Sequence, residues 1–501
     1  MKGGREKKML TQIEIDGFKT FKEFKVELAP FQVIVGPNGS GKSNLFDALQ
    51  LLSRLAEMDL RTAFQGLRGD ADELFTKLPN GKSVDRMRIA VEMLVDRKVK
   101  DDLGKEAELK YTRLRYELEI VKSTDEYGLD QLYVTHESLK TILRDEDRWS
   151  ERYRLSAQNN WLPLFSENQI VSIATVAQKS PTVGEAAIPY ELDKHSLLPG
   201  RPTINLYQDG QIPTEAFKAE RMKRTVLSSV TDTGYVHTFA AREEMRSWRF
   251  LHLNPGALRQ SSSIRGPFSL SKDGGNLPAT LARMQAEDEF ALTDVSRDMA
   301  NLVPGIYRIR VEKNLASNEY DVWVETSSDQ NAFSAQTLSD GTLRLLAFAA
   351  VRNDPQFHGV LCLEEPENGV HPLHLKTMAR VLCEMATDFS DPQQVDEPLR
   401  QVLITTHSPV FISQLDIIDS LLLTIMPMQA GVPGTTLIRA TRMVPVFTPN
   451  IPFQSEVAAE KDTALEIYTI DMLRKYLSSD DLEDARNQLN KARIALMQNN
   501  P

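Results

Sequence analysis

The sequence of 501 residues has few of the features that mark secreted or membrane proteins. It contains two cysteines, Cys362 and Cys383, each in an apolar segment, so we expect reduced thiols and no disulfide framework. No run of about 18 or more uncharged apolar residues occurs. The basic start, MKGGREKKML, lacks the apolar stretch of a secretory signal. These absences predict a cytoplasmic protein without a membrane span.

An excess of basic charge is also missing, because 59 Lys and Arg stand against 70 Asp and Glu, giving a net charge of −11. Proteins that bind nucleic acid over a large surface are usually basic. One segment, residues 216–230, is predicted to be a basic helix. Its cluster of Lys218, Arg221, Lys223 and Arg224 is either a solvated helix face or a surface for nucleic acid or a partner.

Sustained heptads and internal repeats are absent as well, which excludes a long coiled coil. The chain is nevertheless too long for one ordinary core, so two or more lobes are expected. The order strand, helix, strand at 359–365, 373–388 and 401–406 predicts a parallel α/β core. Alternating segments within 86–138 predict an antiparallel β layer beside that core.

The strongest motif is GPNGSGKS at residues 36–43, which fits the pattern G-x-x-x-x-G-K-[ST] in full. It follows the apolar strand expected at 31–35 and precedes a helix expected from about residue 43 to residue 58. A phosphate-binding loop needs this order, because the helix N-terminus contributes a positive dipole toward the anion. The motif therefore predicts a nucleotide site.

Each residue type in this loop has a chemical reason. Gly39 and Gly41 let the backbone curl, so that its N–H groups face the phosphates. Lys42 reaches the β- and γ-phosphates of ATP, and the hydroxyl of Ser43 is placed to bind Mg²⁺. ATP and Mg²⁺ are the expected ligands.

Two adjacent acids end the apolar strand expected at 359–365. Neighbouring residues on a strand point to opposite faces, so one acid can address the metal while the other orients a water. We assign Glu364 to Mg²⁺ and Glu365 to the attacking water.

Two further motifs are weak in isolation. Ser339, in LSDGT, is a natural N-cap for the helix that follows, and Gly341 allows close backbone approach at an end that suits an anion. His407 comes directly after the strand at 401–406, from where it can reach a γ-phosphate. Alone, the first would be a plain helix cap and the second a locally satisfied histidine.

In their order, these motifs resemble those of ABC ATPases. More specifically, the chain resembles the RecF/SMC-related group and its small OLD-like (AAA-15/AAA-21) predicted ATPases. The segments that carry the resemblance are IDGFKTF (15–21), GPNGSGKSN (36–44), KDGGNLPATL (272–281), LSDGTLRLLAFAA (338–350), EEPENGVHP (364–372) and TTHSP (405–409). It covers the first 60 residues and about 265–415.

The resemblance implies an α/β fold, namely an ABC-type P-loop ATPase head that hydrolyses ATP. Such heads enclose two ATP molecules between two subunits, so a homodimer or higher homo-oligomer is implied. Glu365 and His407 are the implied catalytic residues, the latter as a switch histidine, and Ser43 and Glu364 the metal ligands. The implied nucleotide-contacting residues are Gly36, Asn38, Gly39, Ser40, Gly41, Lys42, Ser43, Asn44, Ser339 and Gly341. Ser339 and Gly341 would act on the partner's nucleotide.

The chain is expected to divide into four parts. Residues 1–139 and 265–445 are the two portions of the head. Residues 140–264 are an insert, forming either a short helical hairpin or a partner-binding lobe, and 446–501 are a helical tail. The residues after 415 are too few for a toprim nuclease and lack D-x-D, so a nuclease in this system is expected to be a separate chain.

Some assignments stay open or are disfavoured. The resemblance also implies a glutamine in the segment called the Q-loop. Gln65 and Gln158 are both possible, and neither is assigned. A zinc site at His371 and His374 is disfavoured, because Pro372 lies between them and the neighbouring acids are already assigned.

Three functions compete for this architecture. The first is an ATPase acting on DNA in repair, recombination or phage defence. The second is a nucleotide-gated sensor or scaffold that controls an effector, such as a nuclease, in antiviral defence. The third is a transporter subunit, which Asp340 disfavours because transporters carry glycine there. The acidic chain without a nuclease favours the second.

Overall fold

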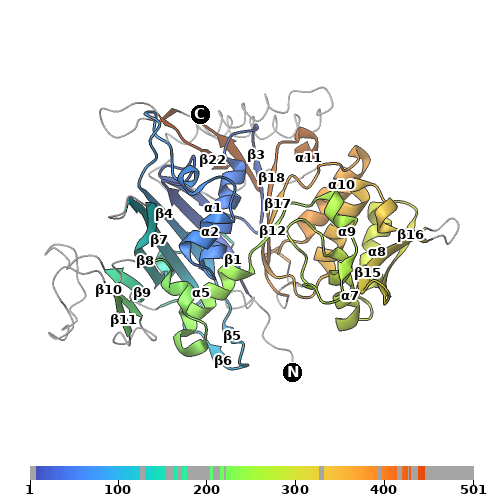
Figure 1. The fold of residues 1–501 in the computed structure, drawn as a ribbon, viewed down its shortest axis with the longest axis horizontal. Coiled ribbons are helices and arrows are strands. Elements are labelled where there is room, and N and C mark those ends of the chain that lie inside the picture. The colour runs from blue at the N-terminus through green and yellow to red at the C-terminus, as the bar shows by residue number, and fades with distance from the viewer. Residues whose placement is uncertain are drawn as a thin grey trace.

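The computed structural model describes residues 7–124, 130–153, 155, 163–166, 172–177, 203–206, 215–218, 222–326, 332–391, 394, 397–413, 420–426, 428–429 and 438–445. The expected helical tail, 446–501, lies outside them. A central sheet separates a lobe built on strands from a lobe built mainly on helices (Figure 1). Among the residues so described, no helix has the length and apolar character needed to cross a membrane.

The central sheet has six strands in the order β12-β17-β18-β3-β19-β22. Their bounds are Arg249–Leu251, Gly359–Glu364, Arg400–Thr406, Phe31–Val35, Leu421–Ile425 and Arg442–Pro445. The first five run parallel and β22 is antiparallel. Strand β3 is buried along its whole length, as expected for a parallel strand covered on both faces. The predicted parallel α/β core is confirmed.

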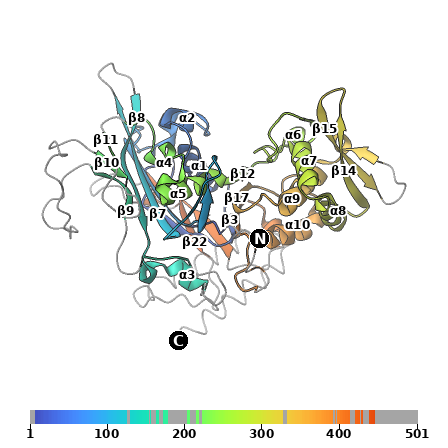
Figure 2. The same ribbon diagram turned by 90° about the horizontal axis from the view of Figure 1, so that it is seen from below.

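An antiparallel sheet of eight strands forms most of the other lobe, in the order β11-β10-β9-β8-β7-β4-β1-β2. The bounds from β1 onward are Met9–Asp16 (β1), Phe24–Glu27 (β2), Arg86–Leu94 (β4), Arg113–Thr124 (β7), Asp130–Thr141 (β8), Ser172–Ala177 (β9), Thr203–Leu206 (β10) and Glu215–Lys218 (β11). The predicted antiparallel layer is therefore present. Figure 2 shows this sheet edge-on, with α1 against it.

Helix α1, Lys42–Leu55, lies between the two sheets. Its apolar residues, Leu45, Leu49 and Leu52 among them, share one core with β1, β4, β7 and with Val360 and Cys362 of β17. This burial fixes the start of α1 at the end of β3, which is where the glycine-rich loop must turn. The short helices α2 (Leu60–Gln65) and α3 (Arg148–Arg152) and the hairpin β5 (Lys98–Lys100) and β6 (Glu106–Glu108) complete this lobe.

The expected insert differs from its prediction. In its described residues the segment adds strands β9, β10 and β11 to the antiparallel sheet, and it contains no helical hairpin there. The basic helix expected at 216–230 is wrong, because Glu215–Lys218 pairs with β10 and, among the described residues of this segment, only Val226–Ser229 (α4) is helical. Pairing with a neighbouring strand outweighs local helix propensity.

The chain also returns to the head earlier than residue 265. Helix α5, Val236–Ser247, contributes Phe239, Ala241 and Met245 to the core that contains α1. Strand β12 then pairs with β17. A division at 264/265 would therefore cut through the head.

The helical lobe has a second core. It contains α6 (Pro255–Leu258), α7 (Leu277–Glu287), α8 (Ala291–Leu302), α9 (Asp340–Asn353), α10 (Pro372–Glu384) and α11 (Pro409–Ser413). A small sheet of β13 (Ser262–Ser263), β14 (Ile306–Asn314), β15 (Glu319–Thr326) and β16 (Ala332–Ser334) covers α7 and α8 on the outside (Figure 1). Strands β20 (Met428–Gln429) and β21 (Ile438–Arg439) pair with each other.

Candidate nucleotide site

The glycine-rich loop joins β3 to α1 and adopts the backbone that its sequence requires. Gly39 and Gly41 have φ of 77° and 95°, in the left-handed region that favours glycine. Gly41 is the N-cap of α1, so the helix dipole points into the loop. Ser40 is buried, and its hydroxyl has no hydrogen-bond partner among the described residues. An unpaired buried hydroxyl in a curled loop suits a polar ligand.

Lys42 folds back over its own loop. Its Nζ donates to the carbonyl oxygens of Gly36, at 2.7 Å, and Pro37, at 3.0 Å. Burial lowers the pKa of Lys42 below its usual value, and the negative charges of Glu365 and Glu367 offset only part of that decrease. The ammonium group of Lys42 is therefore close enough to interact electrostatically with the loop between β17 and α10, residues 365–371, which is called the catalytic loop below.

The loop is braced from behind by residues outside the predicted motifs. Asn44 donates through Nδ2 to Thr20 Oγ1 at 2.8 Å, and Thr441 donates through Oγ1 to the carbonyl of Ser40 at 3.1 Å. A Cβ on Gly41 would lie 2.1 Å from Thr441 Oγ1, so only glycine fits this position. Nothing in the sequence near the loop points to Thr441.

Glu365 lies at the centre of a small hydrogen-bonded cluster. His407 Nδ1 is 2.7 Å from its Oε1, and Asn368 Nδ2 donates to its Oε2 at 2.7 Å. Burial raises the pKa of Glu365, but the bonds from Asn368 and His407 and the charge of Lys42 outweigh it and hold the pKa below the usual value. Glu365 is thus an oriented carboxylate at neutral pH.

The two acids face in opposite directions, although not for the reason that strand alternation suggests. Strand β17 ends at Glu364, and Glu365 has a φ of 44°, which is unusual for a residue other than glycine. Its N–H donates to the carbonyl of Thr405 at 2.8 Å. The chain therefore turns out of the strand at Glu365, and such strained residues are often found at functional sites.

Glu364 is held on the α1 side of β17. Its Oε1 accepts from Arg68 Nη2 at 2.7 Å, and its Oε2 lies 3.2 Å from His252 Nδ1. Arg68 also contacts Asp47 of α1 at 3.2 Å. Neither partner of Glu364 was predicted from the sequence, since Arg68 lies 296 positions away in the chain and carries no motif.

The segment LSDGT opens α9 as predicted. Ser339 is the N-cap, and its Oγ accepts from the N–H of Thr342 at 3.2 Å. A Cβ on Gly341 would lie 2.7 Å from the carbonyl oxygen of Gly369, so α9 packs closely on the loop after the two acids. Figure 1 places α1 and α9 in different lobes. Within the described part of the chain, the hydrogen bonds of the Ser339 hydroxyl go to Thr342 and not to the glycine-rich loop.

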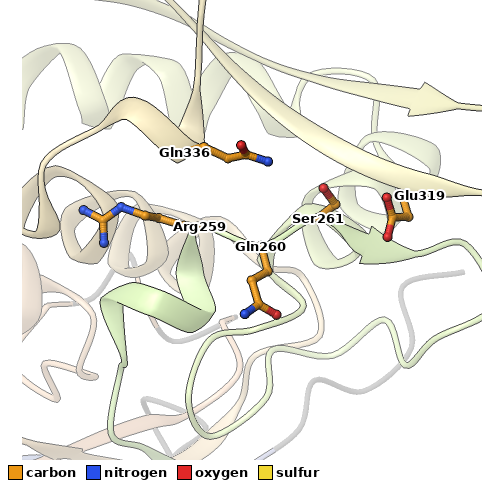
Figure 3. A pocket seen from close by; sticks show the side chains of 5 residues that line it. All are labelled: Arg259, Gln260, Ser261, Glu319 and Gln336. Carbon is orange, nitrogen blue, oxygen red and sulfur yellow. The ribbon is translucent and has the colours of Figure 1, made fainter. Parts of the chain in front are cut away.

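A polar pocket lies beside this helix start. Arg259, Gln260, Ser261, Glu319 and Gln336 line it, and Figure 3 shows these side chains around the opening. Arg259 donates to the carbonyl of Leu338 at 3.0 Å and pairs with Asp340. Arg259, which lies in no predicted motif, therefore fixes the segment that precedes α9.

The remaining sequence candidates lie apart from this cluster. His371 caps the start of α10, where its Nδ1 accepts from the N–H of Leu373 at 3.3 Å, and its ring centroid is 6.1 Å from that of His374. Gln65 ends α2, and Gln158 lies outside the described residues. The structure therefore gathers Lys42, Glu365 and His407, with Asn368 added, and leaves Ser339 and Gly341 in the other lobe.

Comparison with known families agrees with this geometry. A model described as "AAA ATPase domain" matches residues 9–239, and one described as "AAA domain, putative AbiEii toxin, Type IV TA system" matches residues 228–413. The two matched segments meet near the start of α5. Together they include the glycine-rich loop, the LSDGT segment, the two acids and His407.

Two curated relatives are SMC proteins. The chain is 36% identical over 95 residues to the chromosome partition protein Smc of Methanocaldococcus jannaschii, covering 16% of this chain and 8% of that protein. It is 27% identical over 195 residues to structural maintenance of chromosomes protein 4 of Dictyostelium discoideum, covering 37% and 13%. The chain thus matches only a small part of each relative's length.

Solved SMC heads were also found. The head bound to the C-winged helix domain of ScpA has 12% identity and a TM-score of 0.44, covering 87% of this chain and 97% of that one. The head domain from Thermotoga maritima has 13% identity and a TM-score of 0.34, covering 88% and 100%.

The sheet order, the glycine-rich loop between β3 and α1 and the two matching AAA domain models make this chain similar to P-loop ATPases. Over part of its length, the chain is also similar to SMC proteins.

Proposed function

We propose that this chain is a Mg²⁺-dependent ATPase whose heads pair on ATP and thereby control a separate effector protein in antiviral defence. One observation carries the catalytic part of the proposal. The carboxylate of Glu365 is held by His407 at 2.7 Å and by Asn368 at 2.7 Å, within electrostatic reach of Lys42. A fixed carboxylate beside a phosphate-binding loop is suited to orient and deprotonate a water.

The chain's own residues divide the work of hydrolysis. Lys42 exchanges the carbonyls of Gly36 and Pro37 for phosphate oxygens, which hold an ammonium group more strongly because they are charged. Glu365 accepts the proton of the attacking water, since its lowered pKa keeps it ionised. His407 fixes the orientation of that carboxylate and of the γ-phosphate.

The donor set fits Mg²⁺. Ser43 provides a hydroxyl at the start of α1, and Glu364 provides a carboxylate at the end of β17, which are hard oxygen ligands of the kind that Mg²⁺ prefers. When bound, the ion neutralises negative charge on the phosphates. Arg68 and His252 each contact one oxygen of Glu364, and each oxygen has a further lone pair that could bind the metal.

Pairing of heads is supported by the position of the signature segment. Ser339 and Gly341 open a helix in the lobe opposite α1, and Ser339 is exposed. An exposed helix N-terminus suits an anion presented by another molecule. A second copy of the chain would present the γ-phosphate on its own glycine-rich loop.

Control of an effector is supported by the family description over residues 228–413, which names a putative toxin of a toxin–antitoxin system. The chain is acidic, with a net charge of −11, which is unfavourable for extensive DNA contact. We place the protein in the cytoplasm, with a nuclease as the expected effector.

Complementation tests the shared site. A Lys42→Ala chain and a Ser339→Arg chain should each be inactive alone, the first without nucleotide and the second with its closing surface blocked. Mixed dimers contain one composite site in which the P-loop and the signature are both intact, so part of the ATPase activity should return.

The control for that experiment is a chain carrying both changes, mixed with wild type. Cysteines at Ser40 and Ser339 give an independent measurement. An ATP-dependent cross-link between chains supports the shared site, whereas a cross-link only within one chain contradicts it.

A separate experiment tests the effector. Wild type and Glu365→Gln, each tagged, are purified from the native host with ATP, and the co-purifying proteins are identified. A single stoichiometric nuclease whose activity changes with the ATP state supports the proposal. ATP turnover stimulated by DNA, without such a protein, would favour an ATPase acting directly on DNA.

A further inference from the structure

A buried carboxylate beneath the catalytic loop is only half satisfied. Glu367 is 6% exposed, and its Oε1 accepts a hydrogen bond from the hydroxyl of Thr406. Its Oε2 has no hydrogen-bond partner among the residues that the structure describes. A buried oxygen without a partner is costly, so such an atom calls for an explanation.

The signature helix carries a matching group. Arg344 lies on α9, and its Nε is buried without a hydrogen-bond partner within the described ranges. The negative charges of Asp340 and Glu367 both act on this guanidinium, although burial is the larger effect and lowers its pKa. An unpaired donor and an unpaired acceptor of opposite charge therefore occupy the same neighbourhood.

Helix geometry explains why they are neighbours. Gly341 packs on the carbonyl oxygen of Gly369, at 2.7 Å from where its Cβ would be. Arg344 is three residues further along α9 and therefore lies on the same face of the helix. Glu367 is two residues before Gly369, on the loop that this face contacts. Thus α9 and the catalytic loop meet at a contact with no intervening side chain, flanked by two charged groups that each have one buried atom without a hydrogen-bond partner among the described residues.

We infer that Arg344 and Glu367 form an ion pair when the nucleotide site closes, and that the pair positions the catalytic loop against the signature helix. This inference rests on the proposed function, because it concerns closure of the same site. Glu367 accepts a hydrogen bond from Thr406, which is the residue directly before His407. Asn368, which donates to Glu365, is the residue directly after Glu367. Holding Glu367 in place therefore also positions Asn368 and His407, the two side chains that hold Glu365. Both Arg344 and Glu367 are positioning residues, since neither is placed on the nucleotide.

A double-mutant cycle tests the pair. We expect Arg344→Gln and Glu367→Gln each to lower kcat for ATP by about 10- to 100-fold, the range for losing a hydrogen bond to a charged group. KM should change by less than about threefold, because the glycine-rich loop is untouched. The double variant should be no slower than the slower single variant. Arg344→Lys should recover part of kcat by restoring the charge.

The matched control is Arg352 on the same helix. It is paired with Glu384 at 3.0 Å, away from the catalytic loop. Arg352→Gln should leave kcat nearly unchanged and combine multiplicatively with Glu367→Gln. If the effects of Arg344→Gln and Glu367→Gln also multiply, the ion pair is refuted.

A second measurement does not need turnover. The same cycle is read from thermal unfolding, with and without ATP and Mg²⁺. Coupling between Arg344 and Glu367 should be small without nucleotide, where only the charges interact, and should increase when ATP is bound. Equal coupling in both states would overturn the inference while leaving the ATPase intact. By contrast, wild type that neither binds nor hydrolyses ATP would refute the proposed function itself.

Discussion

Thr20 and Thr441 are separated by 421 positions in the chain, yet their hydroxyl oxygens lie 2.6 Å apart directly behind Gly41. Thr441 lies just before β22 and Thr20 just before β2, so the back of the phosphate loop is closed by both sheets. The conformation of the loop thus depends on segments from the two ends of the described chain.

This contact makes Gly41 and Gly39 unequal. Both have positive φ, but a Cβ on Gly41 would lie 2.1 Å from Thr441 Oγ1, whereas a Cβ added to Gly39 would meet nothing within 4 Å. Gly39→Ala should weaken the free energy of ATP binding only by the backbone strain of a left-handed alanine, about 1–2 kcal/mol. Gly41→Ala should lower ATP affinity more than Gly39→Ala does. The double variant Gly41→Ala with Thr441→Ala should recover part of the lost affinity. Calorimetry measures the affinity of each variant. Equal losses at the two glycines would contradict the contact.

Lys42→Ala should abolish nucleotide binding, because it removes the only side-chain cation that the motif places on the phosphates. Fluorescent ATP binding measures this. The control is Lys25→Ala, since Lys25 is exposed and pairs with Glu14 at 3.0 Å. Wild-type affinity in the Lys42 variant would be incompatible with the P-loop assignment.

Glu365→Gln should leave ATP binding intact and slow hydrolysis by roughly 10²–10⁴-fold, as expected for loss of a positioned base. Two heads should then stay together on ATP, which light scattering after gel filtration detects. Glu364→Gln should instead weaken the Mg²⁺ dependence of turnover. If only Glu364→Gln traps paired heads, the roles of the two acids are reversed.

Local sequence patterns were enough to predict the strand and the helix on either side of the glycine-rich loop. The run FQVIV gives β3 at its predicted bounds, and the helix after the loop begins at Lys42 within one residue of the prediction. Both follow from apolar periodicity next to a glycine-rich turn. The direction of Glu365 did not follow, because its positive φ results from how β17 ends against β18.

Long-range partners were beyond sequence patterns altogether. Arg68 on Glu364 and Thr441 behind Gly41 involve separations of 296 and about 400 positions, so no spacing rule connects them. Residues 216–230 were predicted as a helix because their local composition allows one, whereas pairing with β10 makes Glu215–Lys218 a strand.

The buried pair of Arg113 and Asp147 should dominate the stability of the strand-rich lobe. Arg113 Nη2 is 2.7 Å from Asp147 Oδ1, and both side chains are almost wholly buried. Arg113→Met should destabilise the protein by about 3–5 kcal/mol, because it leaves a buried carboxylate unpaired. Arg115→Met, at a more exposed site on the same strand, should cost less. Urea unfolding measures both.

The same pair predicts a pH dependence. Burial raises the pKa of Asp147, but Arg113 and Ser150 outweigh it and hold the pKa below its ordinary value of 3.8. A lowered folded-state pKa gives stability that is complete above the unfolded pKa and is lost as the pH falls through the folded one. The difference in unfolding free energy between wild type and Asp147→Asn should be constant near neutral pH and shrink below pH 3.8. A difference that grows on acidification would contradict this.

The strand order of the central sheet also governs how the protein can be made. Strand β3, at Phe31–Val35, lies between β18 and β19, which begin at Arg400 and Leu421. On a ribosome that adds about 5–20 residues per second, β3 therefore waits roughly 20–80 s before either neighbour is synthesised. Throughout that interval the apolar run FQVIV has no sheet to enter. Because the glycine-rich loop follows β3, it cannot hold nucleotide firmly until β18 and β19 have been synthesised.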